Sequence, residues 1–558
     1  MLKKEVVFSL PFYRQSFKEL YRKKETPPKG ALDEDHLQTK ISLCTHKIRR
    51  EVLLVSPIRS KKKIKDEPRL TVDDVNVVPP KKIRPAIKGT VVGNFMEWYD
   101  FGIYGYLTVT MTAVFTQGLP QEWQLLAVMF GFAVSYLVRP LGGLVLGPLG
   151  DKVGRQKVLY VTMAMMAVST ALIGVLPTAA SIGAWALILL YLLKMIQGFS
   201  TGGEYAGATT YVAEFAPDRR RGYFGSFLDM GSYLGFAAGA SVVAITTWVT
   251  THYWGASAME DFGWRIPFLT AIPLGIIAVY LRTRIPETPA FENNQDEDEA
   301  VIEKDSDDPY ARLGLMGVIR HHWRPLLIGI AIVAATNTAG YALTSYMPVY
   351  LEEQIGLHSA SAAAVTVPIL VVMSLLLPFV GMWSDRVGRK PVYATAVAAT
   401  LILMVPAFLI MNTGTIGAVL IALSMVAIPT GLYVALSASA LPALFPTASR
   451  FSGMGISYNI SVSLFGGTTP LVTQFLLQKT GLDIVPALYI MFFSAIAGVA
   501  LLFMTESSQK PLLGSFPTVE TKSEAVEIVE NQDEDPNIDL SHMPFPDEEN
   551  VGAEKQNA

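Results

Sequence analysis

Acidic side chains stand inside long apolar stretches of this sequence, where a charge is costly to bury. Glu97 and Asp100 are spaced i, i+3, so on a helix they share one face. Two carboxylates this close in a low-dielectric setting do not easily both ionise, so one of them tends to hold a proton. Because a proton carrier needs this property, we predict proton coupling by the acids of these stretches, namely Glu97, Asp100, Glu204 and Asp229.

Two basic residues occupy the same stretches and leave the roles of the acids open. Arg139 has a planar guanidinium that can hold a carboxylate through two hydrogen bonds. It could bind the carboxylate of a substrate or neutralise Asp100. In the alternative interpretation, Glu97 and Asp100 only pair with Arg139 and Lys194 to hold helices together, or they lie at the lipid interface.

The elements that carry these charges are apolar runs long enough to cross a membrane. Of the 558 residues, 51% are hydrophobic and only 17% are charged, against about 25% charged in an average soluble domain. A helix of about 20 apolar residues crosses a bilayer and satisfies its own backbone polar groups. We identify twelve such runs, at 88–115, 124–147, 158–177, 184–212, 222–250, 266–281, 325–351, 362–383, 391–411, 415–437, 451–478 and 483–504. This composition argues against a soluble enzyme, a disordered protein and a nucleic-acid binder.

The Lys and Arg residues of the short loops predict the orientation of the helices. They gather in alternate loops, as in the runs that end at Lys157, Arg221, Lys390 and Arg450. Because basic loops stay in the cytoplasm, both termini are predicted to be cytoplasmic. The predicted organisation is a basic, disordered N-terminal tail (1–85), a six-helix bundle (86–281), a cytoplasmic central loop (282–324), a second six-helix bundle (325–505) and an acidic, disordered C-terminal tail (506–558).

An internal repeat indicates that the two bundles arose by duplication. The pattern G-x-x-x-D-[KR]-V-G-R begins at Gly147 and again at Gly381, 234 residues later. Both copies follow the second helix of a six-helix half. Paired halves of this kind are typical of transporters, which bind their substrates near the membrane midplane between the halves.

These loops are similar to the signature loop of the major facilitator superfamily, and other motifs narrow the resemblance. The motifs are NFMEWYDFGIYG at 94–105, RPLGG at 139–143, KMIQGFSTGGEY at 194–205, EFAPDRRRG at 214–222, GWRIPF at 263–268 and LPALFPT at 441–447. Together they resemble the metabolite:proton symporter family, and within it the bacterial members that import proline and glycine betaine. The resemblance covers about residues 65–515.

The resemblance implies an all-α membrane protein with twelve transmembrane helices in two pseudo-symmetric six-helix bundles. It implies proton-driven uptake of zwitterionic osmolytes through the bacterial cytoplasmic (inner) membrane, stimulated by hyperosmotic stress. Longer family members end in a coiled coil, but here prolines and acidic runs interrupt the tail after Thr505. Osmotic tuning through such a coil is therefore not expected in this chain.

The repeated loops are also candidates for a cytoplasmic gate. Charge networks between loop acids and arginines would latch the two halves together on that side. In the alternative, these charges only anchor the loops in the cytoplasm. The predicted gate residues are Asp151, Arg155, Glu214, Arg221, Asp385 and Arg389.

The implied substrates carry a carboxylate and a substituted ammonium group. A quaternary ammonium has no N–H to donate, so its recognition requires aromatic faces. Many aromatic residues of membrane helices only pack or lie at the interface, which is the alternative here. The predicted substrate-binding residues are Trp98, Tyr99, Tyr104, Arg139, Lys194, Tyr205, Asn337, Tyr341, Tyr346 and Asn459.

Two other functions remain open at this point. A proton symporter of an organic acid, such as a dicarboxylate or a shikimate-like acid, would use Arg139 and Lys194 for the anion. A transport-silent sensor would signal through the acidic tail. The chain has no P-loop motif for ATP, and His321-His322 lacks further ligands at metal spacing. We therefore expect no cofactor, no metal and no nucleic-acid partner, a proton gradient as the driving force, and contact of the basic tail with anionic lipid.

Overall fold

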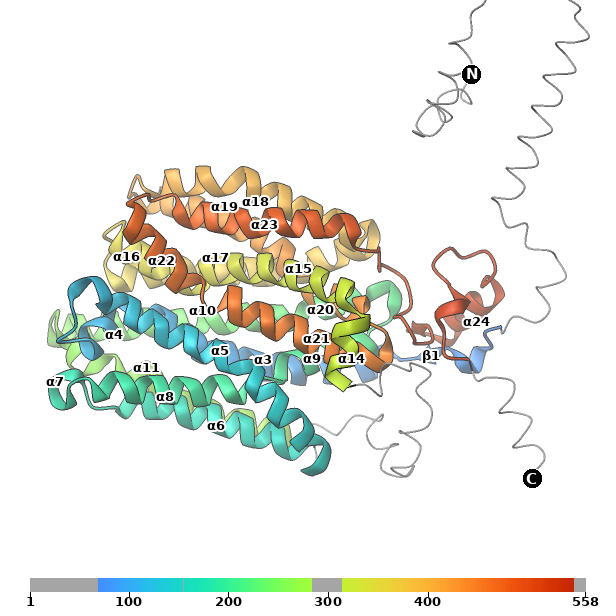
Figure 1. The fold of residues 1–558 in the computed structure, drawn as a ribbon, viewed down its shortest axis with the longest axis horizontal. Coiled ribbons are helices and arrows are strands. Elements are labelled where there is room, and N and C mark those ends of the chain that lie inside the picture. Colours follow the sequence, from blue (N-terminus) through green and yellow to red (C-terminus); the bar gives the residue numbers. More distant parts are fainter. Residues whose placement is uncertain (1–68, 154, 284–313, 546–558) are drawn as a thin grey trace, which may run out of the picture. The chain divides into compact units, whose positions relative to one another are not determined.

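A computed structural model describes residues 69–153, 155–283 and 314–545 (Figure 1). Its first half begins with a long helix that carries Glu97 and Asp100. The fourth predicted span is broken at Thr201–Gly203 into two helices, α8 and α9. The helices of this half are α3 (Pro80–Tyr106), α4 (Thr108–Phe115), α5 (Gln121–Val153), α6 (Arg155–Val175), α7 (Ala179–Ile182), α8 (Trp185–Ser200), α9 (Glu204–Phe215), α10 (Arg221–Trp254), α11 (Arg265–Leu269) and α12 (Ala271–Thr283).

The second half has a similar set of long helices. Two of its spans pass through a π-helical turn, at Ala342–Tyr346 (η6) and at Val462–Gly466 (η8). Such turns are frequent at functional sites. The helices are α14 (Gly314–His321), α15 (Trp323–Tyr341), α16 (Met347–Glu353), α17 (Ser359–Val387), α18 (Arg389–Met411), α19 (Ile416–Val434), α20 (Ser437–Ala440), α21 (Thr447–Ser461), α22 (Thr469–Thr480) and α23 (Val485–Phe503).

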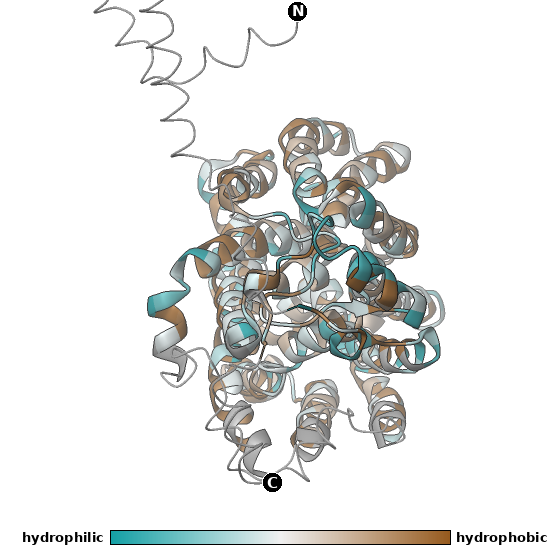
Figure 2. Cartoon of the chain, turned by 90° about the vertical axis from the view of Figure 1, so that its right-hand side faces the viewer, coloured by the Kyte–Doolittle hydropathy of each residue, from teal (hydrophilic) through white to brown (hydrophobic). Residues whose placement is uncertain are grey.

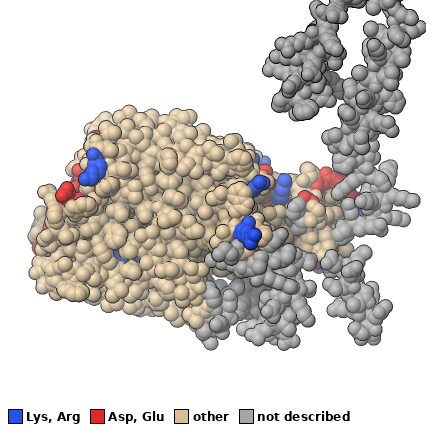
Figure 3. Space-filling model, viewed as in Figure 1, with Lys and Arg blue, Asp and Glu red and all other residues tan. Residues whose placement is uncertain are grey.

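The surface around the long helices is apolar, as a lipid environment requires. Large hydrophobic side chains such as Trp185, Leu502 and Phe503 are exposed there. In Figure 3 the side in view is almost free of charged atoms, and the coloured charges lie towards its two ends. Within the described residues, nine helices are long and apolar enough to cross a membrane. Three further stretches, α3–α4, α6 and α11–α12, occupy the positions of the first, third and sixth predicted spans.

The two halves touch at both ends of the bundle. At one end, Gly222 of α10 and Gly381 of α17 pack so closely that a Cβ on either would collide with the backbone of the other. At the other end, Thr366 Oγ1 of α17 donates to the hydroxyl of Tyr106 on α3 at 2.9 Å. The two halves are therefore joined at both ends of the bundle. We call the end with Gly222 and Gly381 the tail face.

The C-terminal tail folds onto the tail face, which differs from the predicted disorder of residues 506–558. Strand β1 (Asn76–Val77) pairs in parallel with β2 (Thr518–Val519), in the register Asn76↔Thr518 and Val77↔Val519. Helix α24 (Lys522–Glu530) follows. In Figure 2 these hydrophilic segments lie over the end of the bundle, in front of helices with hydrophobic faces. The prediction of disorder is therefore wrong for residues 506–545.

A small apolar core explains why this acidic segment is ordered. It consists of Leu70, Val75, Val519, Ala525 and Ile528. These residues are widely spaced among charges, so the composition of the tail hides them. The prediction of a disordered N-terminal tail is likewise wrong for residues 69–85, which include β1 and the start of α3. Residues 1–68, most of the predicted central loop (284–313) and residues 546–558 lie outside the described part of the chain.

Candidate functional site

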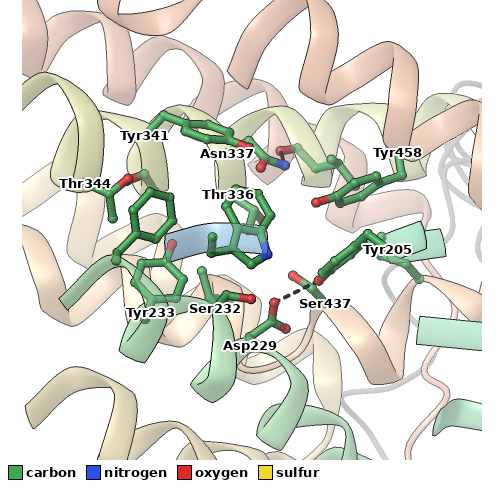
Figure 4. Close-up of a pocket in the computed structure, with 16 residues that line it drawn as sticks. Tyr205, Asp229, Ser232, Tyr233, Thr336, Asn337, Tyr341, Thr344, Ser437 and Tyr458 are labelled. Atoms are coloured by element: carbon green, nitrogen blue, oxygen red, sulfur yellow. Dashed lines mark hydrogen bonds between the residues drawn. The ribbon is translucent and has the colours of Figure 1, made fainter. Parts of the chain in front are cut away.

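A cavity of about 470 Å³, including its open mouth, lies between the two halves (Figure 4). The first half contributes residues from α3, α9 and α10, and the second half contributes the rest. The lining residues are Trp98, Tyr205, Asp229, Ser232, Tyr233, Phe236, Val333, Thr336, Asn337, Gly340, Tyr341, Thr344, Val434, Ser437, Leu441 and Tyr458. We call it the central cavity.

Aromatic rings form much of the wall of the central cavity. Tyr205 and Tyr458, from opposite halves, stack with their ring centroids 4.2 Å apart and their planes 16° apart. The ring of Trp98 lies 5.3 Å from Phe236 and 6.0 Å from Tyr341. The cavity can therefore surround a small molecule with aromatic surface contributed by both halves.

One carboxylate faces this aromatic surface. Among the sixteen described residues that line the central cavity, Asp229 of α10 is the only one that carries a formal charge. Its Oδ1 accepts a hydrogen bond from the Tyr205 hydroxyl at 2.8 Å, drawn as a dashed line in Figure 4. Its Oδ2 is buried and has no hydrogen-bond partner among the described protein atoms. Asp229 thus offers a free acceptor to whatever occupies the cavity.

Arg139 lies behind the wall of the central cavity and is paired with an acid. Its Nη2 contacts Glu97 Oε1 at 2.8 Å, and both side chains are only 1% exposed. The guanidinium lies 4.6 Å from the centroid of the Tyr136 ring and 5.6 Å from that of Trp98. The structure thus shows the pairing of Glu97 with Arg139 that the sequence left open, and it places Arg139 outside the cavity lining.

Lys194 and Asp100 are joined through two intermediate side chains. Lys194 Nζ donates to Gln197 Oε1 at 2.5 Å, and Gln197 Nε2 donates to Thr170 Oγ1 at 3.0 Å. Thr170 Oγ1 in turn donates to Asp100 Oδ2 at 2.9 Å. The chain runs from α8 through α6 to α3. Sequence reasoning missed Gln197 and Thr170, although the i, i+3 spacing of Lys194 and Gln197 places both on one helix face.

The acids predicted to couple protons divide between two cavities. Glu97, Asp100 and Glu204 line a second cavity of about 370 Å³, including its open mouth, that is lined only by residues of the first half, from α3, α6, α9 and α12. We call it the acid cavity. Asp229 lines the central cavity instead. Only the tertiary structure separates Asp229 from the other three.

Several predicted substrate-binding residues lie elsewhere. Three tyrosine hydroxyls are bonded away from the central cavity: Tyr99 to Thr270 Oγ1 (2.6 Å), Tyr104 to the Val128 carbonyl (2.7 Å) and Tyr346 to Gln474 Oε1 (3.0 Å). Asn459 Nδ2 donates to the Gly202 carbonyl at 2.8 Å and so ties α21 to the break between α8 and α9. Trp98, Tyr205, Asn337 and Tyr341 do line the cavity.

Sequence reasoning also missed residues of the cavity wall. They include Tyr233, Phe236 and Tyr458, together with Ser232, Thr336, Thr344 and Ser437. Aromatic, serine and threonine residues are common in apolar helices, so their types alone give no signal. Only the crossing of the helices reveals which of them face the substrate space.

Of the predicted gate residues, Asp385 makes hydrogen bonds between the two halves at the tail face. This residue of α17 accepts from the backbone N–H groups of Gly222 and Tyr223, each at 2.8 Å, at the start of α10. Arg389 Nη2 contacts the same carboxylate at 2.7 Å. A carboxylate is favoured there because the N-terminus of a helix carries a partial positive charge. Asp385 therefore joins the second half to the first, and Arg389 holds its carboxylate from within the second half.

One ion pair crosses between the halves at the tail face within the described residues. Arg450 Nη1 of α21 contacts Glu214 Oε1 of α9 at 2.8 Å. Arg221 pairs with Asp218 within the first half, and its Nη1 donates to the Lys510 carbonyl of the tail at 3.1 Å. The side chains of Asp151 and Arg155 lie outside the described part of the chain, so their gate role stays a prediction.

The C-terminal tail is bonded to both halves at the tail face. Glu506 accepts from the backbone N–H groups of Arg389 (2.8 Å) and Lys390 (3.0 Å), at the start of α18. Further along, the backbone N–H of Thr518 donates to Asp218 Oδ2 at 2.9 Å. The tail therefore spans from the second half to the first across the tail face.

Two helical bundles around a central cavity, joined at one end by an ion pair and by the Asp385 carboxylate, define a membrane transport protein. The chain belongs to the Sugar (and other) transporter family, whose model matches residues 87–514. Its fold is similar to that of the proton:xylose symporter XylE, with a TM-score of 0.60 and 18% identity over 77% of this chain and 97% of that one.

Two curated relatives are similar over nearly their whole lengths. The ectoine/proline transporter ProP of Corynebacterium glutamicum is 96% identical over 504 residues, which cover 90% of this chain and 100% of the relative. The proline/betaine transporter of Escherichia coli K12 is 40% identical over 470 residues, which cover 84% of this chain and 92% of the relative. Both relatives are named as transporters of small molecules.

Proposed function

We propose that this chain imports zwitterionic osmolytes, among them proline, glycine betaine and ectoine, together with protons. The observation that carries the proposal is the central cavity, in which aromatic rings surround one carboxylate. A substituted ammonium suits aromatic faces and an acidic partner. The relatives named for transport of ectoine, proline and betaine support this assignment.

Proton coupling in this proposal depends on the pair of Glu97 and Arg139. Glu97 lines the acid cavity, and its partner Arg139 lies against Trp98, which lines the central cavity. Protonation of Glu97 removes the charge that holds Arg139, so the guanidinium becomes free to move. Proton uptake by Glu97 in the acid cavity can therefore change the position of Arg139 against Trp98, which lines the central cavity. The proton gradient supplies the energy, and no cofactor is required.

The cellular setting follows from the charges at the tail face. Arg219 and Arg220 lie in the short helical turn before α10, and Arg386 lies in the last turn of α17. Basic residues that flank membrane helices favour the cytoplasmic side. We therefore propose a location in the bacterial cytoplasmic membrane with both termini in the cytoplasm. Stimulation by hyperosmotic stress belongs to the same proposal, because the proposed cargo consists of compatible solutes.

The lining of the central cavity disfavours the organic-acid alternative. Arg139 and Lys194, on which an anion would depend, are absent from the sixteen described lining residues. Lys194 is instead bonded to Gln197, 4.4 Å from the centroid of the Tyr104 ring. A dicarboxylate would also face the carboxylate of Asp229 without a compensating cation.

Reconstituted protein provides the test. Proteoliposomes with an acidic exterior are given radiolabelled proline, glycine betaine or ectoine, with succinate as competitor, before and after a hyperosmotic step. We expect uphill accumulation that a protonophore abolishes and that succinate does not reduce. Absence of uphill accumulation of all three solutes, or strong competition by succinate, would contradict the proposal.

A further inference from the structure

The division of the acids between two cavities suggests a different role for Asp229 from that of the other three. We infer that Asp229 is the counter-ion for the cationic nitrogen of the substrate and is not a proton carrier. The inference rests on the proposed function, because it assigns one end of the proposed substrate to one residue.

The geometry of Asp229 suits a ligand-binding carboxylate. The side chain is 5% exposed, and the Tyr205 hydroxyl orients it through Oδ1. Oδ2 is left free on the central cavity, without a Lys or Arg among the described lining residues. A buried carboxylate needs a cation or several donors to be stable as an anion. A substrate ammonium within the cavity is the missing cation.

The rings around Asp229 suit the carbon substituents of that ammonium. Tyr205 and Tyr458 stack beside it, and Trp98 and Tyr233 line the same space (Figure 4). Cations with carbon substituents bind well to the faces of such rings. Tyr205 belongs to the first half and Tyr458 to the second. A cation bound at Asp229 therefore contacts both halves and favours their approach.

The opposite side of the cavity offers only neutral groups to the other end of the substrate. Figure 4 shows Asn337 and Tyr341 across the cavity from Asp229. Asn337 uses one N–H on the Val333 carbonyl, so its second N–H can serve a carboxylate. The cationic end thus has a charged partner and the anionic end does not. A cation that lacks a carboxylate, such as choline, should therefore compete for the site.

The test measures binding without a proton gradient. Purified wild-type protein, Asp229→Asn and the control Asp261→Asn are titrated with proline, glycine betaine and choline by calorimetry. Asp261 lies in the turn Met259–Gly263, outside both cavities. We expect affinity for all three ligands to fall by about tenfold or more in Asp229→Asn and to stay unchanged in the control. Asparagine keeps an acceptor for Tyr205, and a thermal melt confirms folding.

Each remaining outcome decides the question. If Asp229→Asn binds as tightly as the wild type but no longer accumulates proline against a pH gradient, Asp229 carries a proton and the inference is wrong. If Asp229→Asn unfolds, Tyr205→Phe replaces it, because this change keeps the ring and removes the hydroxyl that orients the Asp229 carboxylate. Weaker binding of choline in Tyr205→Phe then supports a cation bound by the carboxylate. Unchanged affinity for choline overturns the inference. If the wild type binds none of the three ligands, the proposed function itself is refuted.

Discussion

Asp385 on α17 accepts a hydrogen bond from the backbone N–H of Gly222, the second residue of α10, at 2.8 Å. A side chain of the second half thus caps a helix of the first half. The contact lies at the tail face, where opening of the central cavity towards that side requires the halves to separate. Closure of the tail face therefore depends in part on this carboxylate.

Replacing Asp385 should loosen the tail face. Asp385→Ala removes the cap of α10 and leaves the buried Arg389 without its carboxylate, so we expect the free energy of unfolding to fall by about 3–5 kcal/mol. Asp385→Asn keeps one acceptor and should lose less. A cysteine at Ser437 in a Cys44→Ser background should react faster with a membrane-impermeant maleimide from the tail side in Asp385→Ala. An unchanged rate would show that Asp385 does not hold the face closed.

Glu97 and Arg139 should stabilise the fold as a pair, so that loss of one charge destabilises the protein more than loss of both. Arg139→Ala leaves a buried carboxylate unpaired and should destabilise by about 3–5 kcal/mol. The double variant Glu97→Gln/Arg139→Gln removes both charges and should recover most of that loss in a thermal melt.

Transport assays distinguish the role of Glu97 in proton coupling from its role in stability. Glu97→Gln should abolish accumulation of proline against its gradient while proline counterflow, which needs no net proton movement, continues. Retained uphill accumulation in Glu97→Gln would show that another group carries the proton.

The chain from Lys194 to Asp100 should depend on the hydroxyl of Thr170. Thr170→Val keeps the shape of the side chain but removes the donor to Asp100 and the acceptor for Gln197. We expect a loss of about 1–3 kcal/mol in stability and slower proton-driven uptake. Thr170→Ser keeps the hydroxyl and is the matched control. Equal uptake by the valine and serine variants would exclude a role for this hydroxyl in transport.

The docked tail can be trapped by a disulfide. Asn76 and Thr518 are direct partners in the parallel pair of β1 and β2. Adjacent strands lie about 4.8 Å apart, which is within the range of Cα separations that a disulfide accepts. In a Cys44→Ser background, Asn76→Cys/Thr518→Cys should form an intramolecular disulfide under mild oxidation, seen as a mobility shift after proteolysis between the two sites. Each single cysteine variant should not. Failure of the pair to cross-link would contradict docking of the tail.

Much of the fold follows from the sequence because lipid imposes simple rules. Apolar runs of about 20 residues must be helical to satisfy their backbone, and the repeated loops at Gly147 and Gly381 reveal two related halves. The prediction of an all-α major facilitator fold is confirmed by the family match and by the fold of XylE. The folded tail escaped prediction because its apolar residues are few and its partners precede α3, more than 400 residues away in the sequence.

The sequence by itself determined that acids and bases occur inside the membrane helices, because charged residues stand out against an apolar background. Only the tertiary structure decided which of them meet. Helices from distant parts of the chain bring Glu97 to Arg139 and turn Asp229 towards Tyr205 in a different cavity. Spacing along one helix says which residues share a face, but it does not say what that face contacts. That depends on how helices cross, and the crossing is set by the packing of many side chains together.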